Sequence, residues 1–272
     1  MSNSVSAGLS ERAGPWGMGL ALLLGAALLA GCVNTTAPVS GAERRQNNVD
    51  AAAINVQLGL DYLQKNELSI AQGKLERALS ENPGSADVHD ALAQLDERLG
   101  DSKGADGEYR RALALSHRSP QMVNNYAVYM CSHGRAPEAV RLFDEAAANP
   151  IYPTPWAAYT NAGICLHSVH RDDEAMLRFA RALQANPAFA DAVFQAASVE
   201  YAQQHLVAAR LRLDVFLMNH PPTPSLLLLG WQIARAQSDL VGQHRFEQVL
   251  SNDFPASTQA HALELAGRSG AD

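Results

Sequence analysis

A repeat of about 34 residues constrains this chain more than any other feature of its sequence. Self-comparison aligns six small residues, spaced 34, 34, 36, 34 and 33 positions apart. They are Ala71, Ala105, Ala139, Ala175, Ala209 and Gly242. A large apolar or aromatic residue follows each of them four positions later, at Leu75, Tyr109, Phe143, Phe179, Leu213 and Phe246. Small residues upstream in the units let a second helix approach closely, so each unit is predicted to be a pair of packed helices.

The unit resembles the tetratricopeptide repeat (TPR), a helix–turn–helix of this same length. Six units follow one another, at about 52–85, 86–119, 120–155, 156–189, 190–222 and 223–256. The resemblance implies an all-α, right-handed superhelical solenoid of about six helix pairs over residues 51–258, with a C-terminal tail at 259–272. The third unit carries two extra residues in NPIYPTPW (149–156), whose prolines predict an extended connection.

The N-terminus is typical of a secretory signal peptide over residues 1–31. Met18–Ala30 carries no charge, and its 13 residues would rise only about 20 Å as a helix, less than the roughly 30 Å of a bilayer core. Leu29-Ala30-Gly31-Cys32 resembles the bacterial lipobox. That resemblance implies a diacylglyceryl group on the Cys32 thiol and cleavage after Gly31; ordinary signal-peptide cleavage is the alternative. Val33 stands where an Asp would retain a lipoprotein in the inner membrane, which favours the outer membrane.

Residues 32–50 are predicted to be a flexible tether between this anchor and the repeats. The segment is polar and contains Pro38 and Gly41, and a coil of this length reaches roughly 20–25 Å. The net charge of −7 and the lack of a Lys/Arg cluster argue against a nucleic-acid partner, because phosphate binding needs a basic surface.

The repeat register predicts which residues line the groove of the solenoid. In the first unit they are Val56, Leu60 and Leu63, an apolar set on one helix face that would suit a partner helix or strand. The equivalent residues of the second unit are polar. The alternative is that the tether or ordinary packing covers the three apolar residues. We therefore expect a protein-binding groove, and no small-molecule substrate.

The cysteines and histidines do not form a recognisable catalytic or metal site. Cys165, His167 and His170 lie close together in sequence, but no distant Cys/His pair completes a zinc site. Motifs for hydrolases, metalloproteases and nucleotide binding are absent, so we expect no catalytic residue, no metal and no cofactor. Cys131 and Cys165 are one repeat length apart, one on the first helix of each of two neighbouring repeats. They are predicted either to form a disulfide or to remain two buried thiols.

Several stretches together resemble the type IV pilus biogenesis lipoprotein family, PilF/PilW. They are NVQLGLDYLQKNELSIAQGKLERALSENPGSADVHDALA (55–93), EYRRALAL (108–115), NNYAVYMCSHGRAPEAVRLFDEAAANPIYP (124–153) and LLLLGWQIARA (226–236). The resemblance implies a pilotin: a lipoprotein that is held in the outer membrane through Cys32, faces the periplasm, binds the secretin subunits of the type IV pilus and promotes their assembly. Two alternatives stay open, a TPR adaptor lipoprotein for another envelope or cell-wall complex and an enzyme that uses Cys or His.

Overall fold

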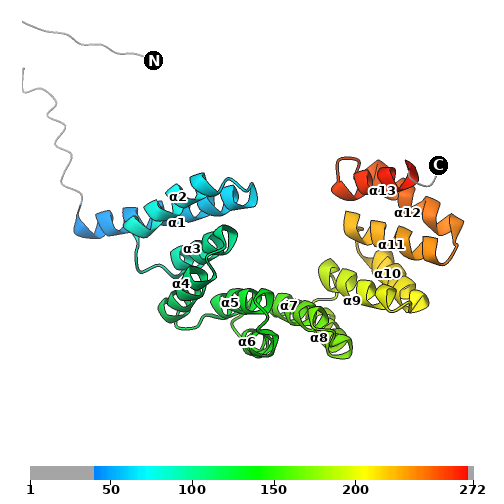
Figure 1. The fold of residues 1–272 in the computed structure, drawn as a ribbon, viewed down its shortest axis with the longest axis horizontal. Helices are drawn as coiled ribbons and strands as arrows, with labels where there is room; N and C mark the ends of the chain where they lie inside the picture. Colours follow the sequence, from blue (N-terminus) through cyan, green and yellow to red (C-terminus); the bar gives the residue numbers. More distant parts are fainter. Residues whose placement is uncertain (1–39, 269–272) are drawn as a thin grey trace, which may run out of the picture. The chain divides into compact units, whose positions relative to one another are not determined.

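The computed structural model describes residues 40–268, which fold into α-helices joined by short turns, and no strand occurs in that range. The predicted all-α TPR solenoid is therefore confirmed. The helices are α1 (Gly41–Gln64), α2 (Leu68–Glu81), α3 (Ala86–Leu99), α4 (Ser102–Leu115), α5 (Pro120–Ser132), α6 (Ala136–Ala148), α7 (Pro155–Ser168), α8 (Asp172–Ala185), α9 (Ala190–Ala202), α10 (Leu206–Asn219), α11 (Pro224–Ala236), α12 (Leu240–Asp253) and α13 (Thr258–Arg268) (Figure 1).

Of the described residues, 40–45 and 46–268 belong to two separate units. In the described part of the first unit, Ser40 and Glu43 cap the start of α1. The backbone N–H of Glu43 donates to the Ser40 hydroxyl (3.1 Å), and the backbone N–H of Ser40 donates to the Glu43 carboxylate (2.7 Å). This reciprocal capping box satisfies donors that the first helical turn leaves unpaired. The prediction of a flexible tether as far as residue 50 is thus wrong for residues 41–50, which are helical.

The second unit is a row of helix pairs, one for each predicted repeat, from α1–α2 to α11–α12. In each pair, the turn between the two helices contains one residue with positive φ. These residues recur every 34 or 36 positions. They are Asn66, Gly100, Gly134, His170, Gln204 and Ser238. A left-handed residue releases the chain from one helix and lets it reverse into the next. Only two of the six are glycine, so the sequence marked this turn clearly at Gly100 and Gly134 alone.

Within a pair, a small residue of the first helix lies against a large residue of the second. Glycine takes this position in three pairs, where Gly59 faces Leu75, Gly163 faces Phe179 and Gly230 faces Phe246. The spacing in sequence between glycine and partner is the same in all three, and the other three pairs carry alanine at the equivalent place: Ala93, Ala127 and Ala197. The repeat therefore encodes close approach of two helices at one point, and the large side chains fill the core around it.

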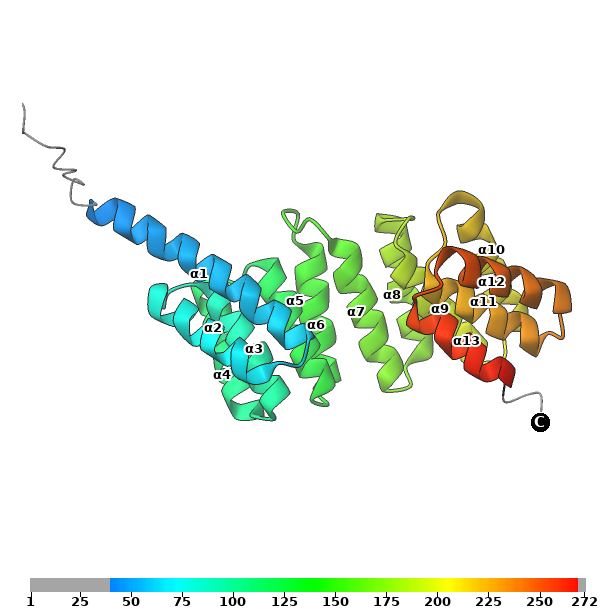
Figure 2. The same cartoon turned by 90° about the horizontal axis from the view of Figure 1, so that it is seen from above.

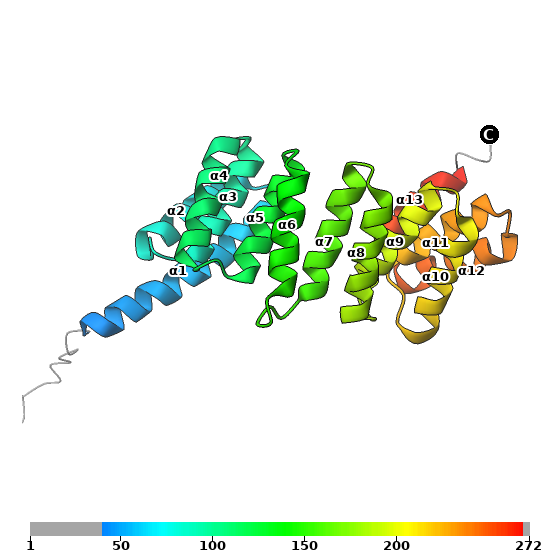
Figure 3. The same ribbon diagram turned by 90° about the horizontal axis from the view of Figure 1, so that it is seen from below.

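Successive pairs pack in chain order through the second helix of one and the first helix of the next. First helices also contact each other directly from α3 to α11, whereas second helices meet through long side chains, as in the ion pairs of Arg178 on α8 with Asp144 on α6 (2.8 Å) and of Arg245 on α12 with Asp214 on α10 (3.0 Å). Figures 2 and 3 show α6, α7 and α8 as neighbours in this row. We call the exposed side of α1, α3, α5, α7, α9 and α11 the first-helix face, and the exposed side of the even-numbered helices α2 to α12 the second-helix face.

The connection between α6 and α7 accommodates the two extra residues of the third repeat. It opens with a turn, because the backbone N–H of Tyr152 donates to the carbonyl of Asn149 (3.0 Å). Tyr152 is buried in the core beside the third repeat, and α7 then begins at Pro155. The connection is thus partly folded back, and less extended than its prolines predict.

Helix α13 follows the sixth pair and packs on α11 and α12 (Figure 2). It buries Ala260 and Leu263 in a cluster with Leu227 and Phe246. The predicted C-terminal tail is therefore wrong for residues 259–268, which belong to this helix. A solenoid exposes the core of its last repeat unless another element covers it, and α13 provides that cover.

Candidate protein-binding face

A ladder of polar side chains crosses the first-helix face from α3 to α7. Asn125 of α5 donates to both carboxylate oxygens of Asp90 on α3 (3.0 Å each), and Gln94 donates to the same carboxylate (3.0 Å). One helix further on, the Asn161 amide of α7 donates to Oδ1 of Asn124 on α5 (3.1 Å). These bonds link three first helices side chain to side chain. Amides can donate and accept together, so the ladder also offers groups that pair with a peptide backbone.

The carboxylate of Asp90 is a buried ionisable group within this ladder. Burial raises its pKa above the ordinary value of an aspartate, and the nearby charges of Asp87 and Glu97 act in the same direction. The hydrogen bonds from Asn125 and Gln94 oppose this shift without cancelling it. The folded state thus favours the protonated form of Asp90 more than the unfolded state does.

We expect Asp90→Asn to raise stability at pH 7 relative to the wild type, and to have almost no effect near pH 3. Because the folded pKa lies above the unfolded one, the favourable contribution of Asp90 is complete below the unfolded pKa of about 4 and is lost as the pH rises through the folded pKa. Asparagine does not ionise and avoids that loss. Urea unfolding of both proteins at several pH values measures the difference, and a difference that does not change with pH would contradict this account.

A small groove lies at the N-terminal end of the same face, between α1 and α3. It has a volume of about 320 Å³ and is lined by Leu60, Leu63, Gln64, Gln94, Glu97 and Arg98. Its polar rim is held by other parts of the fold. Arg98 donates to the carbonyl of Leu63 (3.0 Å), and Glu97 accepts from the Tyr109 hydroxyl (2.5 Å). An apolar wall with a fixed polar rim is the form that side-chain pockets for peptides commonly take.

The structure corrects the prediction that Val56, Leu60 and Leu63 together form an exposed apolar patch. Val56 and Leu63 are buried core residues that pack with Ala71 and Leu75, so ordinary packing between α1 and α2 covers them. Leu60 is half-buried and lines the groove between α1 and α3. Only Leu60 therefore keeps an accessible surface and remains a candidate for binding a partner.

In the second to fourth repeats the first of the three register positions again points into the core. Its residues there, namely Asp90, Asn124 and Thr160, are all buried. The middle position keeps accessible surface in the first four repeats, where its residues are Leu60, Gln94, Val128 and Ile164. Val128 and Ile164 are exposed apolar side chains. We call Leu60, Val128 and Ile164 the apolar row.

Cys131 and Cys165 join α5 to α7 through a disulfide. Their sulfur atoms are 2.13 Å apart and their Cα atoms 5.8 Å apart. Because Val128 and Ile164 precede the two cysteines on the same helices, the bond restrains the spacing of two members of the apolar row. Cys165 is fully buried, and His167 instead pairs with Asp172 (2.7 Å). The structure thus does not bring Cys165 and His167 together as a nucleophile and its base.

Two sequence-based predictions concern residues that the structure does not describe. They are the lipid site at Cys32 and the signal peptide. None of the described helices has the length and apolar character needed to cross a membrane. Between residues 40 and 268, no three Asp, Glu, His or Cys side chains converge in an arrangement that would hold a metal ion.

Six helix pairs with recurrent small–large packing define a TPR protein. A solved TPR protein from Parabacteroides merdae shares this fold with a TM-score of 0.56 and 16% identity, covering 77% of this chain and 82% of that one. No family model matches the sequence.

Comparison with known proteins also finds relatives among type IV pilus proteins. The type IV pilus assembly protein PilF of Pseudomonas aeruginosa is 29% identical over 231 residues, which cover 85% of this chain and 91% of PilF. The solved structure of that PilF matches with a TM-score of 0.59 and 28% identity, over 81% of this chain and 99% of the other. PilW, described as a widely conserved type IV pilus biogenesis factor, matches with a TM-score of 0.61 and 27% identity, over 78% and 97%. The chain is thus homologous to PilF, and its structure matches those of PilF and PilW, TPR proteins of type IV pilus biogenesis.

Proposed function

We propose that this protein is a lipid-anchored pilotin, which binds subunits of the type IV pilus secretin and promotes their assembly in the outer membrane. The observation that carries the proposal is the similarity to PilF over 85% of the chain, together with the lipobox at Cys32. Two or three acyl chains on the mature N-terminus would hold the protein firmly, because each buried CH₂ contributes about 0.8 kcal/mol.

The first-helix face is the surface that we propose for the secretin. The apolar row offers three contact points for apolar side chains of a partner segment. Leu60, at one end of the row, also lines a groove. The Asn161 amide lies beside the row. It uses one N–H in its bond to Asn124, so its second N–H and its carbonyl oxygen can pair with the peptide groups of an extended or helical segment. The disulfide between α5 and α7 keeps part of this surface rigid, which lowers the entropic cost of binding.

We expect Leu60→Asp to reduce secretin multimers several-fold in cells, and Leu60→Asp with Ile164→Asp to remove most of them. A carboxylate at either position places a charge where the partner would bury apolar surface, yet neither side chain is fully buried in the fold. Immunoblots of unboiled outer membranes, compared with a deletion strain, measure the multimers. The matched control is Val241→Asp, which places the same charge at an exposed site of α12 on the second-helix face.

The same strains separate this proposal from the alternative of an adaptor for another envelope complex. Secretin should co-purify with the wild-type protein from detergent-solubilised outer membranes, and less of it with the Leu60→Asp variant. Normal multimers in the deletion strain would overturn the proposal. Recovery of a cell-wall synthase or hydrolase in place of secretin would support the adaptor.

A further inference from the structure

Helix α10 carries an apolar surface that the TPR fold does not require. Its core side is formed by Ala209, Leu213 and Phe216. Its outer side presents four more apolar residues at spacings of four, four and three, which places them in one stripe on the second-helix face. They are Val207, Leu211, Val215 and Met218, with 78%, 62%, 47% and 74% of their surface exposed. We call these four residues the α10 stripe.

The repeat register shows that this stripe is particular to the fifth repeat. Helix α8, one repeat earlier, carries Asp173, Leu177, Arg181 and Gln184 at the same four positions. The position of Val215 is occupied by Arg77, Arg111, Glu145, Arg181 and Gln248 in the other five repeats. Those repeats form the same helix pairs with a polar residue there. The apolar stripe therefore has a cause other than the packing of the solenoid.

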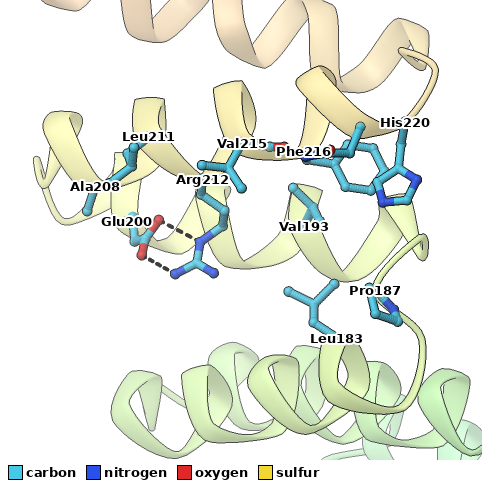
Figure 4. A pocket seen from close by; sticks show the side chains of 11 residues that line it. Leu183, Pro187, Val193, Glu200, Ala208, Leu211, Arg212, Val215, Phe216 and His220 are labelled. Atoms are coloured by element: carbon cyan, nitrogen blue, oxygen red, sulfur yellow. Dashed lines mark hydrogen bonds and ion pairs between the residues drawn. The ribbon is translucent and has the colours of Figure 1, made fainter.

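A groove of about 630 Å³ runs beside the stripe, between α8 and α10, with α9 as its floor (Figure 4). Leu211 and Val215 of the stripe form one wall, and Leu183 and Pro187 belong to the other side. Val193 and Phe216 contribute further apolar surface. The stripe thus continues into a concave site, a form that suits an inserted helix better than a flat surface.

One ion pair lies in this apolar groove and leaves a donor available. Arg212 donates through Nε and Nη2 to the two carboxylate oxygens of Glu200, at 2.9 and 2.5 Å. Glu200 is buried, whereas 30% of the Arg212 side chain is exposed. Within the described residues Nη1 of Arg212 has no hydrogen-bond partner, and in Figure 4 it is turned away from Glu200 toward Val193 and Leu183. A guanidinium held in this way can accept one more acidic or carbonyl oxygen.

We propose that the α8–α10 groove and the α10 stripe bind an amphipathic helix of a protein partner, with apolar residues along one face and an acidic residue that meets Arg212. Charge complementarity favours this occupant, because Nη1 of Arg212, which faces the groove, is a cationic donor. A membrane surface is disfavoured. Arg210 is engaged in two ion pairs and Arg212 in one, so α10 offers one spare cationic N–H and not the cluster of free basic side chains that an anionic bilayer attracts, and the chain is acidic overall.

This site is separate from the face proposed for the secretin. It lies on the second-helix face of the fourth and fifth repeats, whereas the apolar row belongs to the first-helix face of the first, third and fourth. A chain with two such surfaces can hold two proteins at once. The inference does not depend on the identity of the first partner, so the two proposals can fail independently.

The test uses the purified chain and a fluorescein-labelled amphipathic helical peptide, with Leu at positions i, i+4, i+7 and i+11 and one Glu on the same face. A second peptide carries Gln in place of that Glu. Fluorescence anisotropy should show the Glu peptide binding in the micromolar range and more tightly than the Gln peptide. Val215→Arg with Met218→Gln should weaken binding at least tenfold. These substitutions install the residues of α8 at equivalent positions, so the fold should accept them.

Arg212→Lys provides the second, independent variant. Lysine can still neutralise Glu200, but it has no planar fork that points a further N–H at the groove. The preference for the Glu peptide should therefore disappear, while circular dichroism stays unchanged. Equal affinity of wild type and Val215→Arg/Met218→Gln would overturn the proposal. So would a wild-type dimer in sedimentation that the same variant dissociates, or binding to phosphatidylglycerol vesicles that this variant abolishes, because each would assign the stripe to another occupant.

Discussion

Replacing both Cys131 and Cys165 by alanine is expected to lower the free energy of unfolding by about 2–4 kcal/mol. The disulfide closes a loop between residues 34 positions apart, and the unfolded chain gains the conformational freedom that this loop removes. Both cysteines lie inside helices, where alanine is a favourable residue, so the folded state should change little. Urea unfolding of the variant and the wild type measures the difference.

The effect of removing the disulfide should be local as well as large. In a solenoid each repeat contacts only its neighbours, so the lost restraint acts mainly on the third and fourth repeats. Hydrogen exchange should accelerate most in α5 to α8, and much less in α11 and α12. Wild-type protein in a reducing agent should match the variant. Mass spectrometry that finds two unbonded thiols in protein isolated from the periplasm would contradict the disulfide in the cell.

Gly163→Val is expected to destabilise the protein by about 2–3 kcal/mol through a clash inside the fourth repeat. A Cβ atom on Gly163 would lie 2.7 Å from Cδ1 and 2.8 Å from Cζ of Phe179, and Phe179 is itself fully buried. The helices α7 and α8 would have to separate to admit the valine. The measurement is again the free energy of unfolding, determined in urea.

Two further variants make this prediction specific. Gly107→Val, on α4, meets no atom within 4 Å of the new Cβ, so its effect should stay within about 0.5 kcal/mol because only helix propensity changes. Phe179→Ala should cost about 3–5 kcal/mol alone, but the valine would partly fill the space it leaves. The double variant should therefore be more stable than the sum of the two single effects implies. Strict additivity would show that Gly163 and Phe179 do not compete for the same space.

The sequence by itself determined the repeat, because small and large residues recur at fixed positions that only a pair of packed helices explains. Gly163 and Phe179 belong to that pattern, and so do the two glycines at turns, Gly100 and Gly134. The early start of α1 was missed in the sequence, although Ser40 and Glu43 have the spacing of the capping box that the structure shows. The α10 stripe was visible in the sequence as well, because the fifth repeat has Val215 at a position where the other repeats have a polar residue.

Only the tertiary structure decided which apolar residues are accessible. Val56, Leu60 and Leu63 share one face of a helix, and helical spacing alone treats them alike. The neighbouring helices separate them, because Val56 and Leu63 are covered by packing while Leu60 lies at the edge of a groove. The groove beside Arg212 likewise needs α8, α9 and α10 together. Periodicity reports the direction in which a side chain leaves its own helix, whereas its exposure depends on how closely other helices approach, which is a property of the packed chain.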